Sequence, residues 1–498
     1  MAEAQADIVI IGSGMGGATM AAALAPSGRQ IVILERGDYM PDVPQTRDAK
    51  AIFADGYFRP DEVWETPEGE AFNPGNFYYV GGNSKMYGAV LIRYRAEDFE
   101  TREHLGGTSP AWPISYAEME PWYQKAEEMY GVRGDTTQDP TEPAHSGAYP
   151  YPPVADEPAI ADLRHRLTRA GVTPSSLPLG VDIDRWLDGG QTPWDGHPDT
   201  NGGKMDAESV GLARALQHTN VTLLRNTKVT RLEAAADARI TQVHYRQDGA
   251  DHAITPKVTI LSAGAVNTAV LLLASANDNF PTGLANRSDM VGRRFMNHNC
   301  TALLALHPLR RNPSVYQKTL QFNNFYLSGG PGDAPLGNVQ LLGKITTPIL
   351  TSQARLPRPI AAWIAARSVD WYVMSEDLPS RDSRVTLRNG RIVLDWKRSN
   401  WQTHEALVAK TKQVLRKAGY PILLSKPFDR RTPSHQCGTT VFGADPGASV
   451  LNLHCRAHDH PNLYVVDAGF LPTSAAVNPA LTIAAMALRV ADHLKGAA

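Results

Sequence analysis

The chain has 498 residues, of which 42% are hydrophobic, and this is enough for two or three domains or for one large interleaved pair. Its 49 basic and 51 acidic residues give a formal net charge of −2 and are mixed along the chain, which argues against nucleic acid as the main partner. Neither a run of about 18 apolar residues, nor a secretory leader, nor a CxxC pair is visible, so we expect a protein of a reducing cytoplasm without a membrane span or a disulfide framework.

The chain begins with the pattern of a strand, a glycine turn, a helix and a second strand. Residues 8–11 (Ile-Val-Ile-Ile) are wholly apolar and β-branched, which is typical of a strand covered on both faces of a parallel sheet. Residues 18–25 are rich in alanine and predict a helix, and residues 30–35 predict the second strand. This order indicates a βαβ unit.

The turn of this unit is Gly12-Ser13-Gly14-Met15-Gly16-Gly17. Glycines at 12, 14 and 17 allow a tight turn and let the backbone approach a pyrophosphate at the N-terminus of a helix. Glu35 ends the second strand, where a carboxylate accepts hydrogen bonds from ribose hydroxyls. The unit therefore predicts dinucleotide binding, and it does not separate FAD from NAD.

The next region, residues 36–110, is rich in Gly, Pro and aromatic residues. It contains Val80-Gly81-Gly82-Asn83-Ser84, which we interpret as a loop close to the ligand. Ser115 and Glu118 have the spacing of a capping box, which predicts a helix from there to about Tyr130.

Residues 221–232 and 257–275 return to the first pattern, with a predicted strand at 258–261, a turn at 263–265 and a helix at 266–274. A different pattern begins at about residue 300. There Asn389-Gly390 separates two alternating segments, which strongly favours a β-hairpin and hence an antiparallel sheet. A polar helix is predicted from about Thr403 to Lys417.

The C-terminal region carries the chemistry. A predicted strand at 462–466 leads to Asp467, which could bind the ribityl or pyrophosphate part of a long cofactor or could simply end the strand. Asn478-Pro479 precedes a predicted helix at 480–494, and capping alone explains the pair. His435 could be a packed or capping residue, or a base suited to neutral pH.

Five motifs occur together in an order that resembles the glucose–methanol–choline (GMC) flavin oxidoreductases. They are Gly12-x-Gly14-x-x-Gly17, Gly81-Gly82-x-Ser84, Ala263-Gly264-Ala265, His435-x-x-Gly438-Thr439 and Asn478-Pro479. The resemblance spans nearly the whole chain. It implies FAD as cofactor, oxidation of an alcohol at carbon, and a catalytic pair made of His435 and Asn478.

The resemblance also implies a fold and a set of cofactor contacts. The fold is α+β (α/β in its cofactor half), with a discontinuous Rossmann-like FAD-binding domain at 1–105, 205–300 and 430–498 and an inserted antiparallel-sheet substrate domain at 106–204 and 301–429. The implied FAD contacts are Gly12, Gly14, Gly17, Glu35, Arg36, Gly82, Asn83, Ser84, Met86, Gly88, Val229, Ala263, Asp467, Asn478, Pro479 and Thr482.

Two positions depart from many members of the family. Met86 stands where several relatives carry a histidine bonded covalently to FAD, so we expect non-covalent FAD. Tyr87 stands where many relatives have Asn, which changes the shape expected near the flavin N5. No metal site is expected.

Within the family, residues 82–88, 317–319 and 337–340 look like segments of the bacterial pyranose and glycoside oxidases. This likeness implies a sugar or glycoside substrate whose secondary hydroxyl, at pyranose C3 or C2, becomes a ketone. Hydride would pass to flavin N5 and the proton to His435, with O2 or another acceptor taking the electrons afterwards. The residues expected to contact the substrate are Gln317, Asn338, Gln340, His435 and Asn478.

Alternatives remain open for both the function and single residues. The enzyme could be a dehydrogenase that uses a quinone or protein acceptor, a lyase with structural FAD, or, least favoured, a non-catalytic dinucleotide-binding module. His298 and Cys437 are interpreted as structural residues. Core packing is favoured over sugar stacking for Trp371, Trp396 and Trp401.

Overall fold

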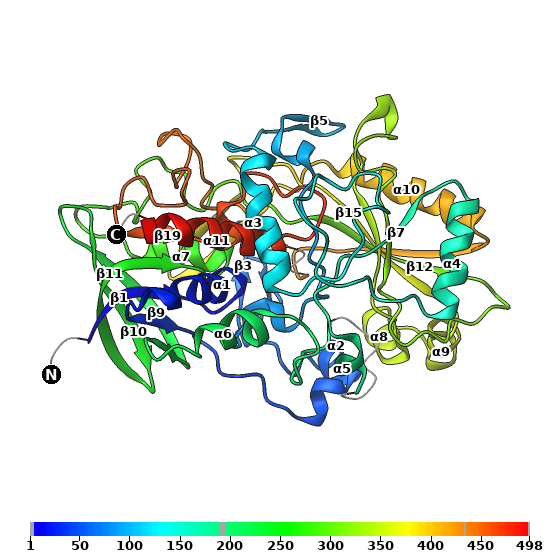
Figure 1. Cartoon of the computed structure of the whole chain (residues 1–498), viewed down its shortest axis with the longest axis horizontal. Helices are drawn as coiled ribbons and strands as arrows, with labels where there is room; N and C mark the ends of the chain where they lie inside the picture. Colours follow the sequence, from blue (N-terminus) through cyan, green and yellow to red (C-terminus); the bar gives the residue numbers. More distant parts are fainter. Residues whose placement is uncertain (1–3, 189–195, 433–434, 497–498) are drawn as a thin grey trace.

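A computed structural model describes residues 4–188, 196–432 and 435–496. Within these ranges the chain forms two lobes, and both ends of the chain belong to the same one (Figure 1). That lobe contains a seven-stranded sheet, and the other contains a six-stranded sheet. The expected α+β architecture is confirmed.

The seven-stranded sheet is parallel at its centre. Its strands are β1 (Ala4–Ile11), β2 (Ile31–Leu34), β8 (Val221–Leu224), β9 (Thr227–Ala234), β10 (Ile240–Gln247), β11 (Ala250–Leu261) and β19 (Leu463–Val465). The order is β8-β2-β1-β11-β10-β9, and β19 pairs with the end of β11. Val9 and Ile10 of β1 are fully buried, as expected for a strand covered on both faces.

The six-stranded sheet is antiparallel throughout, in the order β18-β12-β15-β14-β13-β7. Its strands are β7 (Pro174–Ser176), β12 (Asn299–Leu306), β13 (Leu320–Phe322), β14 (Asn338–Leu341), β15 (Val369–Ser375) and β18 (Ile422–Pro427). Helices α4 (Pro158–Arg169) and α10 (Trp401–Lys417) pack on it through an apolar cluster that includes Leu163, Trp371 and Leu407.

Smaller strands form two further sheets. They are β3 (Trp64–Glu65), β4 (Ala71–Phe72), β16 (Arg384–Arg388) and β17 (Arg391–Asp395) in one, and β5 (Arg102–His104) and β6 (Gly107–Ser109) in the other. The predicted hairpin at Asn389-Gly390 is confirmed, because both residues have positive φ, 53° and 75°, as a two-residue type I′ turn requires.

The remaining helices cover the sheets and connect the lobes. The α-helices are α1 (Met15–Leu24), α2 (Ala49–Phe53), α3 (Tyr116–Met129), α5 (Ile183–Asp188), α6 (Ala213–Ala215), α7 (Ala265–Ala274), α8 (Thr347–Gln353), α9 (Arg358–Ala365) and α11 (Ala480–Gly496). Short helical turns are η1 (Ala25–Ser27), η2 (Pro44–Arg47), η3 (Gly82–Lys85), η4 (Ala96–Phe99), η5 (Ala207–Leu212, a π-helix), η6 (Pro331–Asp333) and η7 (Ala468–Phe470).

Capping residues predicted where two helices begin. The structure confirms the prediction for one helix and corrects it for the other. Helix α3 is capped as expected, because the Ser115 hydroxyl accepts from the Glu118 amide and the Glu118 carboxylate accepts from the Ser115 amide. For α11 the prediction was wrong by one residue. The Pro479 carbonyl accepts from the Ile483 amide at 2.9 Å, so Pro479 occupies the cap position that Asn478 was expected to take.

Two elements of the predicted substrate domain pack on elements of the predicted cofactor domain. Helix α3 packs on α11 of the cofactor lobe, where the Tyr123 and Thr482 hydroxyls are 2.9 Å apart. The β16–β17 hairpin pairs with β3 through Val393 and Glu65. Both elements fall in the predicted substrate domain, so long-range packing crosses the boundary that the sequence pattern suggested.

In the part of the chain that the structure describes, no helix has the length and apolar character needed to cross a bilayer. Cys300, Cys437 and Cys455 are buried, and no disulfide joins them.

Candidate active site

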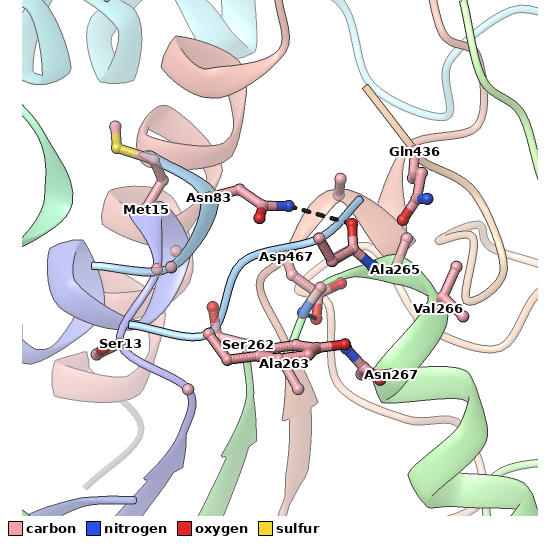
Figure 2. A pocket seen from close by; sticks show the side chains of 18 of the residues that line it. Ser13, Met15, Asn83, Ser262, Ala263, Ala265, Val266, Asn267, Gln436 and Asp467 are labelled. Atoms are coloured by element: carbon pink, nitrogen blue, oxygen red, sulfur yellow. Dashed lines mark hydrogen bonds between the residues drawn. The ribbon is translucent and has the colours of Figure 1, made fainter. Parts of the chain in front are cut away.

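A cavity of about 720 Å³ extends from the glycine turn between β1 and α1 to His435 and Asn478. Figure 2 shows Ser13, Asn83, Ser262 and Asp467 around it, each from a different segment of the chain. Most of the expected FAD contacts line this cavity: Gly12, Gly14, Glu35, Arg36, Gly82, Asn83, Ser84, Met86, Gly88, Val229, Ala263, Asp467, Asn478 and Pro479. Segments far apart in the sequence therefore share one site.

The conformation of the glycine turn lets a ligand approach its backbone closely. Gly12 has φ of 97°, and a Cβ atom there would lie 2.4 Å from the Ser262 carbonyl oxygen. A Cβ on Gly17 would lie 2.0 Å from the Gly12 carbonyl oxygen, so Gly17 packs the helix against the turn and does not line the cavity. Gly14 faces open space, and no side chain caps the first amides of α1. These amides are available to a pyrophosphate.

Glu35 is buried at the end of β2, where its carboxylate organises the turn. It accepts hydrogen bonds from the Ser13 amide at 3.0 Å, the Ser13 hydroxyl at 2.6 Å and the Gly37 amide at 2.9 Å. Burial raises the pKa of Glu35, and these hydrogen bonds oppose that shift. The side chain that we expected to contact ribose thus also fixes the loop that faces the pyrophosphate.

Asp467 follows β19 and joins it to helix α7. Its carboxylate accepts from the Gly264 amide at 3.0 Å, the Gly469 amide at 2.8 Å and the Thr268 hydroxyl. Burial raises the pKa of Asp467 to about 6, against the effect of these hydrogen bonds. Asp467 is therefore both a structural connection and part of the cavity wall.

The lining fits an extended dinucleotide such as FAD. Besides the uncapped helix terminus, the buried Ser262 hydroxyl lines the cavity and has no hydrogen-bond partner among the described residues. The Arg36 guanidinium covers the Tyr78 ring at 3.6 Å and forms another part of the wall. A buried polar group without a partner is uncommon in native proteins and suits a ligand contact.

The segment that carries His435 has an unusual backbone. His435, Gly438 and Thr439 have positive φ values of 70°, 79° and 74°. Such conformations cost about 1–3 kcal/mol for a residue other than glycine and persist where the surroundings impose them. Here Cys437 exchanges two backbone hydrogen bonds with Met296, and a Cβ on Gly438 would lie 2.0 Å from the Arg294 carbonyl oxygen.

His298 determines which nitrogen of His435 carries the proton. Nε2 of His298 lies 2.8 Å and 2.9 Å from the carbonyl oxygens of Ser474 and Ala475, which can only accept, so this nitrogen is a donor. In neutral His298, Nδ1 is then an acceptor, and it lies 3.0 Å from Nδ1 of His435. His435 must therefore donate through Nδ1, which leaves a lone pair on its Nε2.

Asn478 faces that lone pair. Its Nδ2 atom lies 3.2 Å from Nε2 of His435, and both side chains line the cavity. Burial, followed by the electrostatic effects of His298 and Lys318, holds the pKa of His435 well below its ordinary value of 6.5. A neutral imidazole with a free Nε2 can accept a proton from a hydroxyl placed beside it.

Besides Gly17, four expected contacts do not line the cavity. The Thr482 hydroxyl bonds to Tyr123 of α3, and Gln317 donates to the Leu342 carbonyl and the Asp370 carboxylate. Asn338 and Gln340 are fully buried in β14, and Gln340 contacts Asn478 from behind. Packing of the six-stranded sheet places these amides inside the lobe, so direct substrate contact is not supported for them.

The contact between His298 and His435 was not expected from the sequence, where His298 fits a structural residue. In the sequence, only its place in the segment Met296-Asn297-His298 could have indicated a role for His298 near the site. Cys437 is buried, and burial raises the pKa of its thiol, which agrees with packing. The Trp371, Trp396 and Trp401 side chains also lie outside the cavity lining.

Comparison with known proteins identifies the family. The model of the family described as FAD dependent oxidoreductase matches residues 7–290, which is more than half of the chain. The model described as GMC oxidoreductase matches residues 379–487, the region that holds His435 and Asn478. The chain belongs to the GMC family of FAD-dependent oxidoreductases.

Sequence alignments with known relatives span almost the whole length of this GMC oxidoreductase. Paromamine 6′-oxidase from Streptomyces fradiae is 29% identical, over 98% of this chain and 91% of its own. The fructose dehydrogenase large subunit from Gluconobacter japonicus is 26% identical, over 98% and 97%. The crystal structure of pyridoxine 4-oxidase from Mesorbium loti has a TM-score of 0.70 at 18% identity and covers 99% of both chains, which shows the shared fold. The cofactor of this enzyme is FAD, and its substrates carry CH–OH groups.

Proposed function

We propose that this GMC oxidoreductase converts a secondary hydroxyl of a sugar or glycoside, at pyranose C3 or C2, into a ketone, with His435 as the base. One observation carries the proposal: His435 Nε2 and Asn478 Nδ2 are 3.2 Å apart in the same cavity that begins at the glycine turn. A hydroxyl placed beside both nitrogens would meet an acceptor and a donor at once.

The two side chains have complementary tasks. His435 Nε2 accepts the hydroxyl proton as the carbon–hydrogen bond breaks, and His298 continues to hold Nδ1. Asn478 Nδ2 donates to the substrate oxygen, where negative charge grows. Helix α11 begins two residues later, and its N-terminal end favours that charge. Bound FAD supplies the acceptor for the hydride that leaves the substrate carbon.

The residues expected to hold FAD are those of the cavity described above. Gly12 and Gly14 would lie against the pyrophosphate and Glu35 against the ribose, while Asp467 and Pro479 would lie along the rest of the cofactor. Met86 lines the cavity at the position where several relatives attach FAD to a histidine. A thioether cannot form that bond, so we propose that the cofactor is held non-covalently.

The relatives support a carbohydrate-like substrate. Two of them are named for fructose and for paromamine. The position of oxidation is the finer part of the proposal, because one of these names specifies a 6′ position. Anaerobic mixing with glucosides lacking the 2-, 3- or 6-hydroxyl tests it through loss of flavin absorbance near 450 nm. The proposal is supported if the 2-deoxy or the 3-deoxy glucoside fails to bleach the flavin. Oxidation at a secondary position is refuted if only the 6-deoxy glucoside fails to bleach it.

Likeness to the fructose dehydrogenase large subunit favours one alternative, a dehydrogenase with another electron acceptor. Oxygen consumption and peroxide release during turnover would identify an oxidase. Turnover that needs a quinone or an artificial electron acceptor would identify a dehydrogenase. Cleavage of a substrate without flavin bleaching would instead identify a lyase and would end the redox proposal.

A further inference from the structure

A line of buried amides connects Asn478 to a buried ion pair. Its members are Asn323, which follows β13, Asn338 and Gln340 on β14, and Asn478 itself. Asn323, Asn338 and Gln340 are at most 1% exposed. The line ends at Asp139, which pairs with the buried guanidinium of Arg95 at 2.7 Å.

The hydrogen bonds of this line run outward from Gln340 in both directions. Asn323 Nδ2 donates to Asp139 at 2.6 Å, and Asn338 Nδ2 donates to Asn323 Oδ1 at 2.8 Å. Gln340 Nε2 then donates both to Asn338 Oδ1 at 2.8 Å and to Asn478 Oδ1 at 2.9 Å. Gln340 is thus the donor on both sides, Asn338 and Asn323 each donate to the next group toward Asp139, and no bond in the line joins two acceptors.

The carboxylate at the end removes the alternative direction. An ion-paired carboxylate can only accept, so Asn323 must present its nitrogen to Asp139 and its oxygen to Asn338. The same choice then passes to Asn338 and to Gln340. If Gln340 were turned over, its oxygen would face the oxygens of both Asn338 and Asn478, so the line leaves Asn478 only one orientation.

We infer that Gln340 is a positioning residue of the reaction. Through it the Arg95–Asp139 ion pair fixes the Asn478 amide with Nδ2 toward His435 and the substrate. The inference rests on the proposed function in that Asn478 acts on the substrate oxygen. It adds to that function that Gln340 prevents Asn478 from presenting its oxygen to His435.

Two independent constraints agree on this arrangement. From one side, His298 leaves His435 Nε2 as an acceptor. From the other side, Gln340 leaves Asn478 Nδ2 as the donor that faces it. A turned Asn478 would place Oδ1 against that lone pair, and only protonation of His435 would relieve the contact. The line of amides therefore helps to keep His435 unprotonated and able to act as a base.

The test compares two substitutions on facing strands. Gln340→Met removes the donor, and Gln321→Met is the matched control, because Gln321 is the cross-strand neighbour of Gln340 and is equally buried. Gln321 accepts from Asn338 and donates to Asp139 at 3.4 Å, but it does not contact Asn478, and the shorter bonds from Asn338 to Asn323 and from Asn323 to Asp139 remain without it. Both holoenzymes are checked for bound FAD, thermal unfolding and far-UV circular dichroism.

We expect Gln340→Met to lower kcat at least about tenfold with little change in KM, the effect of one lost buried hydrogen bond on the transition state. Gln321→Met should stay within about threefold of the parent protein. Equal losses of kcat in the two variants would overturn the inference. Gln340→Leu is the second variant if Gln340→Met does not fold, because its side chain is also apolar and cannot donate to Asn478 Oδ1.

A second readout does not depend on turnover. With ¹³C-labelled histidine and His435→Ala for assignment, NMR titration gives the pKa of His435 in each holoenzyme. That pKa should rise by about one unit or more in Gln340→Met and not in Gln321→Met. Among the described residues, the other charged or titratable groups that face His435 are His298, Lys318 and Tyr372, and neither substitution removes one of them. An unchanged pKa overturns the inference. The pKa of His435 could also shift as expected in a protein whose flavin no alcohol bleaches. That result would support the role of Gln340 and would refute only the proposed function.

Discussion

The Nδ1 atoms of His298 and His435 face each other at 3.0 Å, and the backbone of residues 474–475 occupies the other nitrogen of His298. Because peptide carbonyls cannot donate, the direction of donation runs from His435 to His298 and from His298 to the main chain. The protein thereby prepares His435 Nε2 as an acceptor before any substrate arrives, and this arrangement can be tested residue by residue.

Replacement of His435 by alanine should remove the base. We expect turnover with any alcohol that bleaches the flavin to fall by roughly 10²–10⁴, the usual contribution of general base catalysis. FAD should stay bound, because His435 lies at the far end of the cavity from the glycine turn. Rapid-reaction measurement of flavin reduction checks the rate, and the visible spectrum checks the cofactor.

His454→Ala is a matched control, because His454 stacks on His493 at 3.8 Å and does not line the cavity. It should leave flavin reduction unchanged. A His435→Ala protein that reduces its flavin as fast as the His454→Ala protein would show that another group takes the proton.

Replacement of His298 by alanine should free the ring of His435. Without its acceptor at Nδ1, His435 can place the proton on Nε2, the nitrogen that must be empty. Loss of one buried hydrogen bond costs about 1 kcal/mol or more, so we expect flavin reduction to slow by about tenfold. If His298→Ala changes thermal stability and leaves the rate of flavin reduction as it was, His298 has only a packing role.

The pH profile of kcat/KM should report a base that titrates on the acid side of its ordinary range. Burial and the neighbouring charges lower the pKa of His435 below 6.5, and only the neutral ring is active. Activity should therefore be lost as pH falls through that lowered pKa and stay level from about pH 7 upward. A midpoint well above 6.5 in the rate of flavin reduction, with a non-ionising sugar as substrate, would contradict this environment for His435.

Glu35→Gln should weaken FAD binding. The carboxylate accepts from Ser13 on one oxygen and from the Gly37 amide on the other, and an amide nitrogen in place of either oxygen would face a donor. We expect the dissociation constant of FAD to rise at least about tenfold, as follows from one unsatisfied buried donor. Titration of the apoprotein followed by flavin fluorescence measures it, and an unchanged dissociation constant would show that the Ser13 loop does not depend on Glu35.

Acid precipitation of the purified protein should release the flavin. Met86 occupies the position from which several relatives form a covalent bond, and its thioether offers no such linkage. We expect yellow colour in the supernatant and a colourless pellet, with the mass of the denatured chain equal to that of the sequence. A chain heavier by one FAD would show covalent attachment through another side chain.

Local features were predictable from the sequence. Gly12, Gly14 and Glu35 belong to one short unit, so their spacing indicates the nucleotide site. The Asn389-Gly390 hairpin and the Ser115 cap also depend on neighbours in sequence, and both occur as expected. In each case the physical determinant lies within a few residues.

The arrangement around the catalytic pair was not predictable in the same way. His298 and His435 are 137 residues apart, and Gln340 and Asn478 are 138 apart. No spacing rule connects such positions, because the contacts arise only when the six-stranded sheet packs against the last helix. Asn478 is an example: its residue type fits a helix cap, and its tertiary neighbours give its side chain another role.

β11 has one further consequence, for the synthesis of the protein. Its first half pairs with β10, and its last residues pair with β19, which comes about two hundred positions later in the chain. The carboxyl end of the nucleotide-binding sheet therefore stays open until the final segment has left the ribosome. The wall of the cofactor cavity is consequently complete only when these last residues are present, and a chain interrupted before residue 463 would lack both that strand and Asn478.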